Sequence, residues 1–283
     1  MTGNRSPFAL AGPALLFCPA DRPERFAKAV ATADVVILDL EDGVGADDKT
    51  TARQALQATP LDPGSTIVRI NPVGTEDHTR DLEALAGTAY PTVMLAKTES
   101  AAQVAPLAPR NVVALCETPL GVTAAGEIAA ADPVVALMWG AEDLIAGLGG
   151  RSSRFPGIAV GTGRATAGRY RDVARAARSL VLLAAGAQRR LAIDAVHLDI
   201  PDVDGLREEA EDAAASGFSA TACIHPSQVE VVRTAYRPTD EQLDWARRVL
   251  DAARGARGVF AFEGGMVDGP VLRHAEQLLS RRG

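Results

Sequence analysis

The chain has 283 residues, 47% of them hydrophobic, and a formal net charge of −7. This length suits one α/β barrel with an appendage, and the hydrophobic content is enough for a large core. The negative charge argues against a nucleic-acid or membrane-surface protein, since a phosphate-rich polymer would be repelled by it.

The N-terminal run Phe8–Ala20 superficially resembles a signal sequence, but Pro13 and Pro19 interrupt it. No segment of the chain has the length of a membrane span, so we predict that this run is the first strand of the fold. The three cysteines are far apart, each within an apolar run: Cys18, Cys116 and Cys223. Their odd number and apolar surroundings favour reduced, buried thiols in a cytoplasmic protein.

Eight short apolar runs alternate with alanine-rich, charged segments of helical periodicity. The predicted strands are Ala14–Cys18, Val35–Leu40, Thr66–Ile70, Thr92–Ala96, Val112–Cys116, Val134–Trp139, Ala195–Ile200 and Ala220–Ile224. The predicted helices are Glu24–Ala33, Lys49–Ala58, Arg80–Gly87, Ala101–Leu107, Val122–Ala131, Tyr170–Ala187 and Val203–Ser216. This alternation predicts an α/β fold of the (β/α)8 TIM-barrel class, with a doubly wound open sheet as the alternative.

Two segments depart from the alternation. Gly147–Gly168 is rich in Gly, Ser, Thr and Arg and matches no phosphate-binding spacing, so we predict a mobile loop over the barrel mouth. Beyond a closing helix, Pro226–Ala235, we divide the chain into a barrel, 1–236, and an appendage, 237–283. The appendage should contain a capping box (Thr239, Gln242), helix Glu241–Ala253, the apolar run Gly258–Phe262, a flexible Gly264–Gly265 and helix Pro270–Ser280.

Charged and polar residues gather just after the predicted strands. They are Asp21, Arg22, Glu41, Asp42, Arg69, Asn71, Lys97, Glu99, Glu117, Asp143, Asp199, Asp202 and His225. The loops at the opposite ends of the strands carry little charge. Because the active site of such a barrel lies at the C-terminal ends of its strands, we predict the site at this mouth.

Two of these residues, Glu117 and Asp143, follow neighbouring predicted strands. Oxygen ligands with no soft partner suit Mg²⁺, which completes its octahedron with water and substrate oxygens. For Glu117 the alternative is a carboxylate paired with a neighbouring arginine. Arg69 ends the third strand, and its planar fork suits bidentate capture of a carboxylate, the alternative being a salt bridge with Glu41 or Asp42.

Seven stretches resemble, in order, the citrate lyase beta-subunit-like family of HpcH/HpaI aldolases. They are Leu16–Phe26, Leu38–Asp42, Val68–Asn71, Glu117–Thr118, Gly140–Leu144, Ile224–Gln228 and Met266–Asp268. The likeness covers nearly the whole chain and is nearest to stand-alone, mycobacterial-type members. It implies a barrel of the phosphoenolpyruvate-binding superfamily. It also implies magnesium-dependent, reversible cleavage of a 3-hydroxyacyl-CoA, such as citramalyl-CoA, malyl-CoA or hydroxymethylglutaryl-CoA, to acetyl-CoA and an oxo acid.

The resemblance also implies roles for the catalytic groups. Glu117 and Asp143 match the family's magnesium ligands, and Arg69 matches the arginine that holds the carboxylate of the oxo acid. Asp268 matches the proton-transfer aspartate, although its position before Gly269–Pro270 equally fits a helix N-cap. In the family this segment reaches over a neighbouring subunit, which implies a homotrimer.

The resemblance implies a coenzyme A site formed by residues near the N-terminal and C-terminal ends of the barrel sequence. Phe17, Arg22 and Lys28 match positions that hold coenzyme A in related lyases, and a capping box of Asp21 with Glu24 should place a helix N-terminus there. A solvated helix face is the alternative for Arg22 and Lys28. Ile224 and His225 are expected to line the thioester side, with a structural histidine as the alternative.

Two positions depart from the family pattern and leave the acyl substrate open. Ala96 replaces a proline before the strand-four lysine, and Ala220–Thr221 replaces a Gly-Lys pair, which removes a positive charge near the thioester. Three rival activities remain. They are a Schiff-base aldolase with Lys97 as nucleophile, a malyl-CoA-type thioesterase, and a citryl-thioester lyase subunit of a citrate lyase complex.

Overall fold

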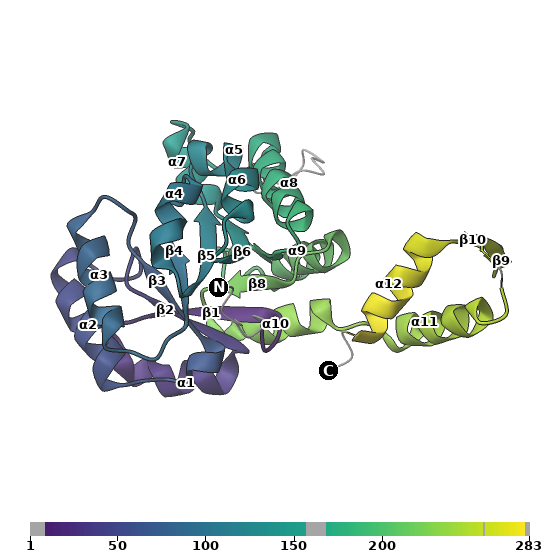
Figure 1. Cartoon of the computed structure of the whole chain (residues 1–283), viewed down its shortest axis with the longest axis horizontal. Coiled ribbons are helices and arrows are strands. Elements are labelled where there is room, and N and C mark those ends of the chain that lie inside the picture. The colour runs from purple at the N-terminus through teal and green to yellow at the C-terminus, as the bar shows by residue number, and fades with distance from the viewer. Residues whose placement is uncertain (1–8, 157–167, 257, 281–283) are drawn as a thin grey trace. The chain divides into compact units, whose positions relative to one another are not determined.

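The computed structural model describes residues 9–156, 168–256 and 258–280. The chain divides into two compact units, Met1–Val232 and Arg233–Gly283. In the first unit, helices surround a barrel of strands, with α1–α3 on one side and α8 and α9 on another (Figure 1). Within the described residues, no helix combines the length and apolar character needed to cross a membrane.

The first unit is a closed barrel of eight parallel strands in sequence order. They are β1 Ala14–Pro19, β2 Val35–Asp39, β3 Thr66–Ile70, β4 Thr92–Leu95, β5 Asn111–Cys116, β6 Val134–Trp139, β7 Leu191–Asp194 and β8 Ala220–Cys223. β1 pairs with both β2 and β8, which closes the ring. The predicted TIM barrel is therefore confirmed, and the open sheet is wrong.

Helices follow the strands as predicted, with local differences. They are α1 Phe26–Thr32, α2 Lys49–Ala58, α3 Glu76–Ala86, α4 Ala101–Val104, α5 Pro119–Thr123, α6 Ala125–Ala130, α7 Ala141–Gly147, α8 Asp172–Ala187, α9 Val203–Ser216 and α10 Pro226–Tyr236. The predicted helix Val122–Ala131 is in fact two, α5 and α6, which are separated at Ala124. The first begins earlier than predicted, at Pro119, because Thr118 caps it by accepting from Gly121 N. Helix α7 was not predicted.

Alternate side chains of the strands fill the barrel interior. One buried cluster takes residues from all eight strands, spaced two apart wherever a strand contributes more than one: Leu15, Val35, Ile37, Ile67, Met94, Val113, Leu115, Ala136, Met138, Ile193, Ala220 and Ala222. Side chains from every strand can meet in this way only inside the barrel. The same alternation directs Asp39, Arg69 and Glu117 inward, and it directs Trp139 and Asp194 outward toward the helices.

The seventh strand was predicted at the wrong place. It spans Leu191–Asp194, whereas the predicted run Ala195–Ile200 forms the loop that follows it. The strand ends at Asp194, whose buried carboxylate forms an ion pair with Arg178. The apolar run on which the prediction was based follows the strand and does not pair with its neighbours. Asp199 consequently lies in an exposed loop, and Asp202 caps α9 by accepting from Gly205 N.

The predicted capping box at the first helix is also wrong. A 3-10 turn, Pro23–Arg25, precedes α1, and neither element has a side-chain cap. The Asp21 carboxylate instead lies 3.2 Å from Arg22 Nε. The predicted burial of the cysteines is confirmed, since Cys18, Cys116 and Cys223 are all buried and none of them forms a disulfide.

The second unit packs two helices and a small hairpin around their own apolar cluster. Its elements are α11 Asp240–Ala253, β9 Phe260–Phe262, β10 Gly265–Val267 and α12 Gly269–Ser280. The predicted Thr239/Gln242 capping box opens α11. The predicted flexible point, Gly264–Gly265, lies at the turn of the hairpin. Glu263 and Gly264, both at positive φ, form the tight turn that pairs Gly265 with Phe262.

Candidate active site

Arg69 is held at the end of β3 by the carboxylate that ends β2. Its Nε donates to Asp39 Oδ1 at 2.7 Å and its Nη2 to Asp39 Oδ2 at 2.5 Å, while Nη1 lies 3.0 Å from Glu41 Oε2. The guanidinium carbon lies 4.8 Å from the centre of the Phe17 ring. The predicted salt bridge is therefore present, with Asp39 and Glu41 rather than Asp42. The two hydrogen bonds to Asp39 use two of the five N–H groups of the guanidinium, so others can serve a ligand.

Asp39 is itself fixed by the turn after β2. Its Oδ1 accepts from Glu41 N at 2.9 Å and its Oδ2 from Gly43 N at 2.8 Å. A side chain at position 43 could not fit, because its Cβ would lie 2.3 Å from Asp39 Oδ2. The turn thus orients Asp39, and Asp39 orients Arg69.

Lys49 joins this turn to the end of β3. Its Nζ donates to Leu40 O, Glu41 O and Asn71 Oδ1 at 2.7 to 2.9 Å. The Asn71 amide in turn donates to the buried Asp81 at 2.7 Å. Sequence reasoning missed this support by Lys49, because a lysine in the first turn of a helix carries no signal of a partner on the neighbouring strand.

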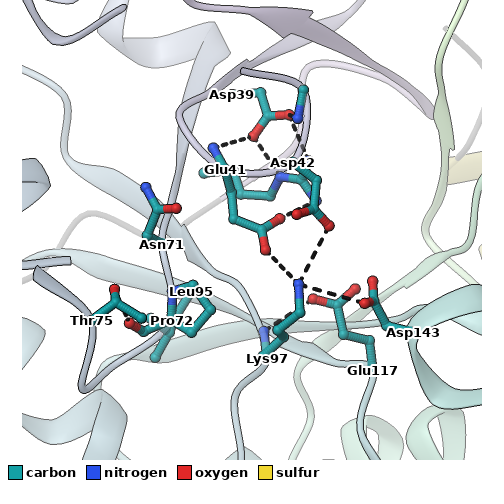
Figure 2. A network of polar contacts seen from close by, with 12 residues as sticks. Asp39, Glu41, Asp42, Asn71, Pro72, Thr75, Leu95, Lys97, Glu117 and Asp143 are labelled. Atoms are coloured by element: carbon teal, nitrogen blue, oxygen red, sulfur yellow. Dashed lines mark hydrogen bonds and ion pairs between the residues drawn. The ribbon is translucent and has the colours of Figure 1, made fainter. Parts of the chain in front are cut away.

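Glu117 and Asp143 occupy the ends of neighbouring strands, as predicted. Glu117 follows β5 and is buried, while Asp143 lies in the first turn of α7 after β6. Close to them, Gly140 leaves room for the Glu117 carboxylate, since a Cβ there would lie 2.8 Å from Glu117 Oε2. Figure 2 shows the two carboxylates beside each other.

The electrostatics of Glu117 fit a divalent cation. Burial, and secondly the nearby Asp143 charge, raise the pKa of the Glu117 carboxyl to about 8, although Lys97 opposes this. A bound cation would favour the charged form that the apolar surroundings disfavour. Among the described residues, no three His, Cys, Asp or Glu side chains converge on a metal position. The chain therefore offers two hard oxygen ligands, and waters and substrate oxygens would complete an octahedron.

Lys97 lies among the carboxylates with its ammonium paired. Its Nζ is 2.5 Å from Glu41 Oε1, 3.4 Å from Asp42 Oδ2 and 3.6 Å from Asp143 Oδ1. Burial alone would lower the pKa of this ammonium, but the contacts with Glu41, Glu117 and Asp143 raise it. A protonated amine cannot attack a carbonyl, so this environment argues against Lys97 as a Schiff-base nucleophile.

The residues expected at the coenzyme A site lie after β1 and β8. Arg22 and Lys28 are exposed, on the turn and helix that follow β1. His225 is exposed beyond β8, and its Nδ1 lies 2.7 Å from Ser227 Oγ and 3.2 Å from Ser227 N. Ile224 is half-buried. Phe17 contacts the guanidinium of Arg69, a contact the sequence did not reveal.

Asp268 belongs to the second unit, between β10 and α12. Its Oδ1 accepts from Val271 N at 3.4 Å and its carbonyl accepts from Leu272 N at 3.1 Å, so the predicted cap is present. Its carboxylate is partly exposed. Half of the predicted loop Gly147–Gly168, residues 157–167, lies outside the described residues.

A second charged group, the outward cluster, lies between β6, β7 and α8. Asp194 accepts from Trp139 Nε1 at 2.6 Å, from Arg178 Nε at 3.0 Å and Nη2 at 2.8 Å, and from Ala195 N at 3.0 Å. Arg178 also reaches Asp212 on α9 at 2.5 Å. These contacts hold α8 against the sheet, and both carboxylate oxygens of Asp194 accept hydrogen bonds.

Comparisons with known proteins point to one family. The family model of HpcH/HpaI aldolase/citrate lyase matches residues 14–226. A citrate lyase subunit beta-like protein of Mycobacterium tuberculosis is 68% identical over 273 residues, 96% of each chain. Citrate lyase subunit beta of Escherichia coli is 34% identical, covering 88% of this chain and 85% of its own.

Further relatives show which ligands and activities occur nearby. The crystal structure of M. tuberculosis CitE in complex with magnesium, acetoacetate and coenzyme A matches with a TM-score of 0.89 and 68% identity, over 96% of this chain and 98% of that one. A (3S)-malyl-CoA thioesterase of Cereibacter sphaeroides is 32% identical, covering 94% of this chain and 93% of its own.

Proposed function

The chain belongs to the HpcH/HpaI aldolase/citrate lyase family, and on this premise we propose that it is a magnesium-dependent lyase of 3-hydroxyacyl-CoA thioesters. The products would be acetyl-CoA and a 2-oxo acid, and the reaction would be reversible. The observation that carries the proposal is the arrangement of Glu117, Asp143 and Arg69 at one mouth of the barrel. The magnesium and coenzyme A in the M. tuberculosis relative support it.

Each group of the inward-facing site has a separate task in this reaction. Glu117 and Asp143 would hold magnesium, which when bound acts as a Lewis acid toward the oxygen of the oxo-acid carbonyl. Arg69, already oriented by Asp39, binds the carboxylate of the same oxo acid through its remaining N–H groups. Two points of attachment fix the orientation of the carbon that gains or loses its bond.

Asp268 is the proposed proton-transfer group. In cleavage, the bond between the hydroxyl-bearing carbon and the methylene carbon breaks and its electron pair passes to the thioester enolate. The hydroxyl proton passes to water as the carbonyl forms, and Asp268, in its protonated form, delivers its proton to the methylene carbon, giving the methyl group of acetyl-CoA. In condensation, Asp268 removes the proton from this methyl group.

We further propose a homotrimer in which Asp268 acts in a neighbouring subunit. The hairpin beside Asp268 exposes Met266, whose relative exposure of 68% suits a contact with another chain. Co-expression of Glu117→Ala and Asp268→Asn subunits tests this arrangement, because mixed trimers would contain sites with both groups intact. Activity recovered only in the mixture would support action across subunits, and an inactive mixture of assembled trimers would contradict it.

Two alternative activities keep the same site but differ in the thioester substrate or in what happens to it. The C. sphaeroides relative favours a thioesterase, and the E. coli relative favours a citryl-thioester lyase subunit. Incubation of the protein and Mg²⁺ with malyl-, citramalyl-, hydroxymethylglutaryl- and citryl-CoA separates the three. Acetyl-CoA with an oxo acid supports the proposal, and free CoA without an oxo acid supports hydrolysis. Turnover that requires an acyl-carrier protein supports the subunit role.

A further inference from the structure

We propose that Lys97 is the resident cation of the magnesium site, whose ammonium pairs with Asp143 until the metal displaces it and then remains on Glu41. This inference rests on the proposed metal ligands of the lyase but not on its substrate. It gives Lys97 a positioning role in place of the nucleophilic role that its strand-end position first suggested.

The ammonium lies where carboxylates from three parts of the mouth meet. Figure 2 shows Lys97 with Glu41 and Asp42 above it and with Glu117 and Asp143 beside it. The Nζ atom lies within 3.6 Å of oxygens of Glu41, Asp42 and Asp143. In the described part of the chain, no other lysine or arginine side chain forms an ion pair with Asp143.

The backbone of Lys97 takes part in the same cluster. Lys97 has a φ of 49°, a left-handed conformation that is unfavourable for a lysine. In this conformation its N–H donates to Glu117 Oε1 at 3.0 Å while its side chain reaches Glu41. One residue therefore contacts one proposed metal ligand through its backbone and the other through its ammonium.

The ammonium is held unequally, and this decides which contact would break. The contact with Glu41 is 2.5 Å long, and the Glu41 side chain is 4% exposed. The contact with Asp143 is 3.6 Å long, and the Asp143 side chain is 35% exposed. Longer and more exposed ion pairs are weaker, and a divalent cation attracts a carboxylate more strongly than an ammonium does. Metal binding should therefore release Lys97 from Asp143 and leave its pair with Glu41 intact.

The need to displace Lys97 from Asp143 lowers the affinity of the site for Mg²⁺. In the protein without metal, Lys97 compensates part of the negative charge and keeps Asp143 in place. During binding, that compensation must be replaced by the metal. A side chain of similar length without charge would leave Asp143 uncompensated and should therefore bind Mg²⁺ more tightly.

Calorimetric titration of Lys97→Met with Mg²⁺ tests this prediction without any substrate. We expect binding at least about tenfold tighter than in the wild type, because the metal no longer displaces an ammonium from Asp143. Lys97→Arg, which keeps the charge, should bind no more tightly than the wild type. Arg80→Met removes the same charge from an exposed pair with Glu76 on α3 and should change the affinity by less than about twofold.

The outcomes separate this inference from the proposed function. If the wild type binds no Mg²⁺, both are overturned. If the wild type binds Mg²⁺ and a folded Lys97→Met protein binds it equally or more weakly, only the inference is overturned.

Crystals of the wild type with Mg²⁺ and with chelator give a second measurement that needs no variant. We expect the Lys97–Asp143 separation to exceed about 4 Å with Mg²⁺ while the Lys97–Glu41 contact remains. A Lys97–Asp143 contact that persists in the Mg²⁺-bound crystal would overturn the displacement.

Discussion

Two groups of charged residues lie at the ends of barrel strands, on opposite faces of the sheet. In the outward cluster, Asp194 accepts hydrogen bonds from Trp139, Arg178 and the backbone N–H of Ala195. In the inward cluster, five carboxylates lie around Arg69 and Lys97: Asp39, Glu41, Asp42, Glu117 and Asp143. The Asp194 carboxylate is saturated with donors and fastens a helix to the sheet. The carboxylates of the inward cluster keep oxygens that are weakly held, such as Asp143 Oδ1 at 3.6 Å from Lys97, and these favour the binding of a cation.

Removing a ligand from the inward cluster should have the largest effect. For Glu117→Ala we expect magnesium-dependent cleavage to fall by about 10³-fold or more, because the metal would lose one of its two protein ligands. The rate of acetyl-CoA release measures this, with circular dichroism as the check on folding. Asp143→Ala should behave alike, and full activity in either variant would contradict the two-carboxylate site.

Asp268 belongs to neither cluster, and its substitution tests whether the inward cluster suffices. For Asp268→Asn we expect turnover to fall by about 10²-fold or more, since an amide cannot transfer the proton. Coenzyme A and oxo-acid binding, measured by calorimetry, should persist. Unchanged turnover would reduce Asp268 to the N-cap that the structure contains.

Breaking the outward cluster should affect stability instead of chemistry. Arg178→Met leaves Asp194 buried without its main partner, and we expect a loss of about 3–5 kcal/mol in the free energy of unfolding. Urea denaturation measures this loss. The folded fraction should keep its Mg²⁺ affinity, and a change in that affinity would contradict the separation of the two clusters.

A conservative change at Arg69 should have a smaller and more selective effect. Lysine cannot reproduce the two parallel bonds to Asp39, so Arg69→Lys should lose orientation at the carboxylate-binding site. We expect the Kd for an oxo acid such as pyruvate to rise about tenfold while that for acetyl-CoA changes little. Equal losses for the two ligands would count against the assigned role.

The pH dependence of the metal-free protein tests the inward cluster without substrate or metal. The pKa of Glu117 rises from 4.5 to about 8 on folding, so the folded chain binds this proton more tightly than the unfolded chain. The resulting stabilisation is complete below pH 4.5 and is lost as the pH rises through about 8. Thermal melts from acid to alkaline pH should therefore decline less steeply for Glu117→Gln than for the wild type. Parallel declines would show that Glu117 ionises normally.

The sequence alone determined the barrel and most of its strands, because an apolar run buried on both sides is a local property of the chain. It also placed Glu117, Asp143 and Arg69 at strand ends, where parallel strands bring distant residues to one mouth. The seventh strand failed this reasoning, since the charge of Asp194 is compatible with a strand only when Arg178 and Trp139 are beside it.

Only the tertiary structure decided what each charged residue does. Side chains on the two faces of a strand look alike in sequence, but the closure of the barrel places Glu117 among other carboxylates and Asp194 against an arginine. The partners of Lys97 lie after three different strands, and its left-handed backbone has no sequence signal. Charge balance depends on neighbours that are distant in the chain, so it became visible only when the strands closed into a ring.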